Sequence, residues 1–267
     1  MSICIAIAVP DGIALSVDSQ TTWMNTITQV KEKGTAKAIE LEQPIIMPIS
    51  WSKMARKMFS INFSGNTYAF CVAGVALLNQ KTMLSIFTRL GMIYSGDGSF
   101  DDVINFVKDG LKDELKTHLN LTDLKSSVLF LNIEFIMCSH IDNDISKPRI
   151  ESWLIHSGTI NAANGILLDK SEYRKWTNFE NGKYALGGTW IGMSDYISHI
   201  VSHQNPNLPQ IQGQYELFSL SDAVDYTNFL VNFTCDFQRF AITVPNCGRP
   251  IISATLQQGA YSEKIID

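Results

Sequence analysis

Two residues near the start of the chain have types and a spacing that could do chemistry. Ser2 carries a hydroxyl beside the chain terminus, and Asp18 follows sixteen residues later. Two short apolar runs lie between them, residues 3–9 and 13–17, separated by Pro10-Asp11-Gly12. These turn residues between apolar runs predict a β-hairpin. Neighbouring strands lie about 4.8 Å apart, so Asp18 is expected close to Ser2 in space.

The chemistry open to Ser2 depends on the loss of Met1, which the small side chain of serine favours. Removal of Met1 leaves a hydroxyl and a free α-amine on one residue. An α-amine has a pKa of about 7.7 to 8.0, so it can take up a proton near neutrality. The Ser2 hydroxyl would then be a nucleophile whose own amine serves as the general base.

The composition fits a globular protein with a substantial core, because 45% of the 267 residues are hydrophobic and 18% are charged. The net charge is -5, so the composition does not indicate the basic surface that nucleic-acid binding requires. The cysteines are odd in number and form no C-x-x-C pair, which argues against a disulfide framework or a zinc site. Free thiols of this kind are typical of a reducing compartment.

The apolar N-terminus does not have the features of a signal peptide. It has no basic n-region, and the turn at Pro10 breaks it after about eight residues. No stretch approaches the roughly 20 apolar residues that span a bilayer. The sequence therefore predicts a soluble, cytoplasmic protein that contacts neither membrane nor nucleic acid and needs no cofactor.

The remaining pattern predicts strands and helices in separate runs. Strands are expected at 57–61, 68–73, 127–138, 149–157, 184–186, 240–244 and 250–256, and helices at 75–90, 99–119, 189–203 and 221–236. Such an order disfavours an alternating βαβ sheet. It fits an α+β fold, a four-layer αββα sandwich of two antiparallel sheets flanked by helices. We expect one domain over 1–267, with an insertion at about 23–53.

The run from Ser2 to Ile7, followed by the run from Asp11 to Ser19, resembles the opening of proteasome β-type subunits and of the related bacterial proteasome-like protease. These proteins are N-terminal-nucleophile hydrolases. The resemblance implies that Ser2 takes the place of the family's N-terminal threonine and Asp18 that of its strand-end aspartate. It also places Thr22 on a threonine whose backbone contacts substrate.

A second segment carries the resemblance further. Lys57 opens a K-x-x-x-I strand, and residues 72–76 resemble the Ala-Gly that precedes the family's first helix. The resemblance implies that Lys57 pairs with Asp18 and lowers the pKa of the nucleophile. It implies that the Gly74 N–H forms an oxyanion hole beside a helix N-terminus, and that Ala76 contacts substrate. Because about twenty extra residues precede Lys57, Lys33 and Lys37 stay open as alternatives.

The C-terminal half departs from the family pattern. Residues 185–189 resemble the family's G-S-G segment, but Gly188 stands where the family has an active-site serine. Asp236 resembles the family's supporting aspartate, and Arg239 stands where a second serine is usual. His199 and His203 have metal-ligand spacing, but they lack the glutamate of H-E-x-x-H and a third ligand. We expect no metal site.

Three functions follow from these features. The first is a threonine-peptidase-like hydrolase that cleaves peptide or amide bonds with its N-terminal serine. The second, motivated by Gly188 and Arg239, is a catalytically silent ring or scaffold subunit. The third is an N-terminal amidohydrolase acting on a small amide. The resemblance also implies a homo-oligomer such as a ring, and an ATPase as a partner.

Overall fold

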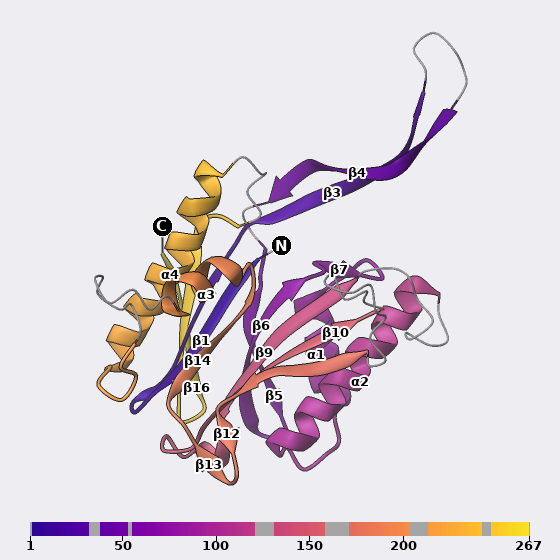
Figure 1. Ribbon diagram of the computed structural model, residues 1–267. Helices are drawn as coiled ribbons and strands as arrows, with labels where there is room; N and C mark the ends of the chain where they lie inside the picture. The colour runs from indigo at the N-terminus through magenta and orange to yellow at the C-terminus, as the bar shows by residue number, and fades with distance from the viewer. Residues whose placement is uncertain are drawn as a thin grey trace.

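The computed structural model describes residues 2–31, 38–52, 55–120, 131–157, 171–202, 213–241 and 247–266. Its body contains two five-stranded antiparallel sheets that lie face to face (Figure 1). The strand order is β14-β1-β2-β15-β16 in the first sheet and β11-β10-β9-β6-β5 in the second.

The elements follow the chain in runs of one type, as the sequence predicts. The first sheet consists of β1 (Ile3–Val9), β2 (Gly12–Asp18), β14 (Gly187–Gly192), β15 (Ile251–Gln257) and β16 (Ala260–Ile266). The second consists of β5 (Met58–Phe63), β6 (Asn66–Gly74), β9 (Asn132–His140), β10 (Pro148–His156) and β11 (Glu172–Thr177). The helices are α1 (Met83–Ile93), α2 (Phe100–Leu119), α3 (Asp195–Ser202) and α4 (Leu220–Phe240).

Three further hairpins lie outside these two sheets. The longest joins β3 (Thr21–Lys31) to β4 (Ala38–Ser52) and falls on the expected insertion. Two short ones pair β7 (Leu77–Leu78) with β8 (Lys81–Thr82), and β12 (Phe179–Glu180) with β13 (Lys183–Tyr184).

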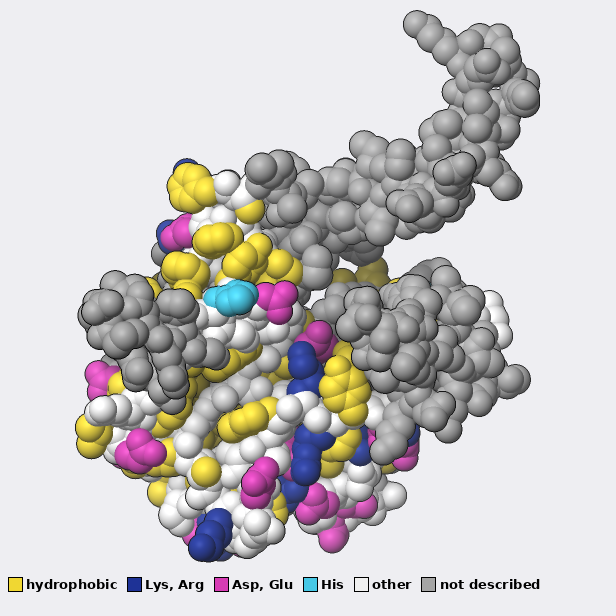
Figure 2. All heavy atoms as spheres, viewed as in Figure 1, with side chains coloured by type: hydrophobic (Ala, Val, Ile, Leu, Met, Phe, Trp, Pro, Cys, Tyr) yellow, Lys and Arg dark blue, Asp and Glu magenta, His cyan; other side chains and the backbone are white. Residues whose placement is uncertain are grey.

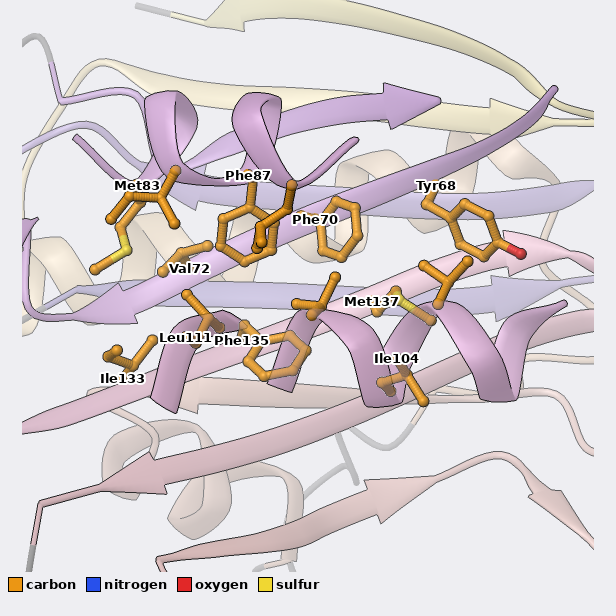
Figure 3. Packing of buried hydrophobic residues seen from close by; sticks show 14 of the residues in the cluster. Tyr68, Phe70, Val72, Met83, Phe87, Ile104, Leu111, Ile133, Phe135 and Met137 are labelled. Carbon is orange, nitrogen blue, oxygen red and sulfur yellow. The ribbon is translucent and has the colours of Figure 1, made fainter. Parts of the chain in front are cut away.

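The two sheets and the helices on their outer faces form four layers, and one apolar cluster lies between each pair of adjacent layers. Small side chains and larger aliphatic ones together fill the space between the sheets, where Cys4, Cys71 and Cys138 are buried. A second cluster joins the β5, β6 and β9 face to α1 and α2; Phe70 and Phe87 lie at its centre, with ring centroids 4.8 Å apart (Figure 3). The third cluster packs the other face of the first sheet against α3 and α4. The αββα sandwich is therefore confirmed.

Strand β1 reads as an unbroken apolar run because both of its faces are buried. Cys4, Ala6 and Ala8 point toward the second sheet, and the alternate residues, Ile3 and Ile5 among them, point toward the helices. Burial on both faces holds the head of β1, and with it Ser2, inside the structure.

Two helix boundaries differ from the prediction. The helix expected from Val75 begins at Met83 instead, because the β7–β8 hairpin intervenes with Asn79 at positive φ, and Thr82 caps the helix N-terminus. The helix expected from Thr189 begins at Asp195, because residues 187–192 pair with β1. Strands β11 and β16 were not predicted. The strand expected at 184–186 is displaced, because β13 ends at Tyr184 and β14 begins at Gly187. Of the strands expected at 127–138 and 240–244, residues 127–130 and 242–244 lie outside the described residues, and Phe240 is the last residue of α4.

No helix in the described part of the chain is both long enough and apolar enough to cross a membrane.

Candidate active site

The carboxylate of Asp18 is the most heavily bonded group near the chain terminus. Asp18 ends β2 and is fully buried. One oxygen accepts the Ile3 N–H at 2.9 Å, and the other accepts the N–H groups of Gln20 at 3.1 Å and Gly248 at 3.2 Å. Both oxygens lie 2.9 Å from the Lys57 Nζ. Burial raises the pKa of Asp18, and the Lys57 ammonium and the backbone N–H groups oppose that rise.

Lys57 is held in place from several directions. Its backbone carbonyl accepts the Val72 N–H at 2.8 Å, its ammonium also donates to the Gln20 carbonyl, and only 7% of its side chain is exposed. The ion pair expected between Lys57 and Asp18 is thus present. The alternatives Lys33 and Lys37 lie outside the described residues.

Ser2 lies at the head of β1, between Asp18 and the end of β14. It is 6% exposed and borders a cavity. Its carbonyl accepts the Met193 N–H at 2.7 Å, and the next residue, Ile3, donates its N–H to Asp18. Two strands therefore fix the backbone of Ser2 from opposite sides, while Met1 lies outside the described residues.

Gly74 ends β6 and borders the same cavity as Ser2. Its φ is +94°, and a Cβ atom at this position would lie 2.2 Å from the Asn132 carbonyl oxygen, so only glycine fits. The expected helix N-terminus is not beside it, because α1 begins at Met83. An oxyanion hole here would use the Gly74 N–H without the immediate support of that helix.

The register of β14 corrects the interpretation of Gly188. Gly188 pairs with Ile7, well inside the sheet, whereas Gly192 pairs with Ile3. The segment beside Ser2 is therefore Gly192-Met193-Ser194. A missing side chain at Gly188 removes nothing from the site.

Glu134 is a charged group beside this segment that the sequence analysis missed. It lies on β9 opposite Ala73 and reaches across to the other sheet, where it accepts the Gly192 N–H at 3.2 Å. Lys175 pairs with it at 2.7 Å. Only the register of two separate sheets brings Glu134 to this place, so no local motif could have identified it.

Asp236 and Arg239 occupy different surroundings from those that the resemblance implies. Asp236 is half-exposed and pairs with Arg249 at 3.2 Å, and it does not border the cavity. Its ion pair holds the segment whose Gly248 N–H reaches Asp18. Arg239 is exposed and lies over the Phe240 ring.

The cavity at Ser2 has a volume of about 660 Å³. Ala76, which the resemblance predicts as a substrate contact, borders it together with apolar residues that include Val72, Met83 and Leu131. The charged side chains on its described lining are Arg56 and Lys57, and none of the described lining residues is acidic. Thr22 lies on β3 opposite Trp51, next to the cavity residue Thr21.

This arrangement can support acyl transfer at Ser2. Ser2, Gly74 and the Lys57 of the buried ion pair border the same largely apolar cavity. His199 lies exposed on α3 and His203 is outside the described residues; no group of three metal-ligating side chains occurs within the described ranges.

Comparison with solved structures places the fold among proteasome-like proteins. The chain is similar to Anbu (ancestral beta-subunit) from Yersinia bercovieri, with a TM-score of 0.54 and 14% identity over 99% of this chain and 86% of that one. It is similar to a Gly-1 mutant of Anbu from Hyphomicrobium sp. strain MC1, with a TM-score of 0.53 and 13% identity over 100% and 87%.

A third similar structure is that of the helical assembly of the Anbu complex from Pseudomonas aeruginosa, with a TM-score of 0.52 and 14% identity over 99% and 86%. At these identities the comparison shows the fold alone. No protein-family model matches the chain. No curated protein matches it either.

Proposed function

We propose that the chain is an N-terminal-nucleophile hydrolase that cleaves peptide or amide bonds with Ser2 after removal of Met1. The observation that carries the proposal is the position of Ser2, which borders the cavity and is joined through the Ile3 N–H to the buried Asp18–Lys57 pair. The proteasome-like fold of the Anbu structures supports the same reading.

The proposed reaction proceeds in two steps. Ser2 Oγ attacks the amide carbonyl carbon while its proton passes to the Ser2 α-amine, and the Gly74 N–H stabilises the oxyanion. The ammonium returns the proton to the leaving nitrogen as the C–N bond breaks, which leaves an acyl ester on Ser2. Water then attacks the ester and releases the acid. Lys57, held by Asp18, supplies a positive field that favours the ionised oxygen.

The cavity lining favours an apolar side chain next to the cleaved bond. Its described side walls are largely apolar, and its charged groups are both cationic. A basic substrate side chain would meet like charge there, with no acidic partner among the described lining residues, and its burial would be costly. Substrates with aliphatic residues are therefore expected to react faster than those with lysine or arginine.

The test compares Ser2→Ala with Ser19→Ala on a panel of short peptides and acylated amino acids. Ser19 is a matched control because it is also buried near Asp18 and its N–H bonds to the Gly248 and Pro250 carbonyls. Hydrolysis lost in Ser2→Ala and retained in Ser19→Ala supports the proposal. Hydrolysis unchanged in Ser2→Ala would refute it, and reaction of acylated amino acids alone would favour the small-amide amidohydrolase.

A silent scaffold subunit is the second candidate, and the placement of Asp236 favours it. Asp236, which resembles the family's supporting aspartate, forms an ion pair with Arg249 and does not border the cavity. If the protein assembles but hydrolyses no substrate of the panel, the scaffold function is favoured. Assembly into a homo-oligomer belongs to both candidates and is supported by the helical assembly of a protein of similar fold.

A further inference from the structure

The β3–β4 hairpin, called the arm below, projects from the sandwich (Figure 1). It leaves the body beside the candidate active site, where Thr21 and Ser52 border the cavity, and its strands pair from there to Lys31 and Ala38. Two-stranded hairpins are at best marginally stable alone in water. A hairpin of this length therefore needs a surface to dock on.

The sequence of the arm is suited to an apolar contact. Its strands contain many large apolar residues, among them Trp23, Ile27, Ile45, Ile46 and Trp51. Three lysines and three glutamates between residues 21 and 52 leave it without net charge. Its attraction to a partner must come mainly from apolar burial and backbone hydrogen bonds, since no charge imbalance is available.

A second apolar surface has no cover in the described structure. Phe229, Phe233, Phe237 and Phe240 follow one another at intervals of four, four and three residues and so share one face of α4. Phe229, Phe237 and Phe240 are 43%, 48% and 81% exposed. Tyr196 of α3 stacks on Phe237 with ring centroids 4.5 Å apart. These four phenylalanines are called the aromatic ladder below.

The aromatic ladder is more than scattered surface apolarity. Leu230 and Val231 of α4 pack on the first sheet, and the aromatic ladder extends the apolar surface of the helix beyond this buried face. Figure 2 shows hydrophobic side chains gathered over the upper end of α4. Contiguous exposed aromatic side chains of this kind mark protein contact sites.

We propose that the arm of one copy docks on the aromatic ladder of the next copy. Figure 1 shows the arm extending away from the body and from α4, so the arm of a copy does not lie on its own aromatic ladder in this structure. A contact between different surfaces repeats from copy to copy and generates a ring or a helical filament. A protein of similar fold forms a helical assembly.

The size of the arm is sufficient for such a contact. At about 3.4 Å per residue, the 11 residues of β3 span about 37 Å. A ribbon about 10 Å wide then offers roughly 370 Å² on each face. Burial of both faces, one on the aromatic ladder and one on adjoining surface, approaches the roughly 800 Å² per partner of a stable interface.

The first experiment measures the mass of the full chain and of two variants by sedimentation velocity. In the arm-deleted variant, an Asn-Gly turn replaces residues 24–49 and joins Trp23 to Ser50, which face each other across the hairpin. The ladder variant carries Phe237→Asp and Phe240→Asp. Met92→Asp is the control, because Met92 is 80% exposed on α1, away from both surfaces. Assembly is expected for the full chain and the control, and monomers for both variants.

Mixing the two variants tests the pairing directly. The arm-deleted variant keeps the aromatic ladder and the ladder variant keeps the arm, so the mixture is expected to form a one-to-one dimer and nothing larger. Absence of that dimer, or a full chain that stays monomeric, would overturn the proposal. If the ladder variant still assembles, the proposal is also overturned, and this holds even if the arm-deleted chain fails to fold. These readouts do not involve hydrolysis, so they stand apart from the reactivity of Ser2.

Discussion

Ser2 is bounded on one side by Asp18 and Lys57, and on the other by Gly192 and Glu134, and these two sides are constructed differently. On the Asp18 side, a fully buried carboxylate accepts three backbone N–H groups and an ammonium. On the Gly192 side, the Glu134 carboxylate is paired with a partly exposed lysine and accepts a single backbone N–H. Electrostatic interactions therefore contribute more to stability on the Asp18 side than on the Gly192 side. The Gly192 side mainly sets the position of the Ser2 backbone.

The largest effect is expected from Lys57→Met on the Asp18 side. The substitution leaves the Asp18 carboxylate buried without its cation, which costs about 3 to 5 kcal/mol for pairs of this kind. Chemical denaturation measures the loss. Asp236→Asn is the matched control, because its ion pair with Arg249 is half-exposed and should cost less than about 1 kcal/mol. Equal losses for the two variants would contradict the comparison.

Gly192→Ala tests the Gly192 side by sterics alone. A Cβ atom there would lie 1.9 Å from the Ser2 carbonyl oxygen, at a φ of +84°. The strand end must move, so we expect a destabilisation of about 2 to 4 kcal/mol and loss of hydrolysis. Gly182→Ala has a similar φ of +78° but open space around it. A Gly192→Ala protein as stable and active as Gly182→Ala would show that the close approach is unimportant.

His140 shows what burial does without a partner, in contrast to Asp18. It is 3% exposed, and neither ring nitrogen has a hydrogen-bond partner in the described structure. Burial lowers its pKa from 6.5 to about 4, although the nearby Asp144 opposes the shift. Folding thus favours the neutral ring, and this contribution to stability is present above pH 6.5 and is lost as the pH falls toward 4.

The expected loss of stability is about 2 to 3 kcal/mol at pH 4 relative to pH 7. Denaturation curves of the full chain and of His140→Phe between these values measure it. The variant should show a smaller decline with falling pH. An identical decline in both proteins would assign the acid sensitivity to other groups.

The smallest effect is expected from Glu134→Gln. The amide still accepts the Gly192 N–H but loses the charge, so the cost should be about 1 kcal/mol or less. Asp142→Asn is a suitable control, because Asp142 forms an ion pair with Lys147 and neither residue borders the cavity. We expect a several-fold lower rate of hydrolysis for Glu134→Gln only. An effect as large as that of Lys57→Met would reverse the ranking of the two sides.

Ser2 and Asp18 could be placed together from the sequence because their geometry is local, since a tight hairpin sets them side by side. The αββα layering followed from long apolar runs that need burial on both faces. The hairpin and the layering depend on neighbours in the chain, which patterning records well. Lys57 is 39 residues from Asp18, and only the resemblance indicated it, with Lys33 and Lys37 open as alternatives.

The Gly192 side could not be predicted in the same way. Residues 189–192 suit a helix or a strand equally by pattern, and only pairing with β1 decides between them. The placement of Glu134 requires the register of two sheets at once. The β7–β8 hairpin likewise interrupts a helical apolar pattern through left-handed residues at Asn79 and Gln80, which the periodicity does not reveal.

The central claim is that Ser2 is an N-terminal nucleophile, and intact-mass spectrometry with an epoxyketone probe tests it most directly. The probe captures a hydroxyl and an α-amine on the same residue. The account predicts a chain without Met1 that gains one probe per molecule, and no gain for Ser2→Ala. A mature chain that retains Met1, or one without Met1 that takes up no probe, would contradict it.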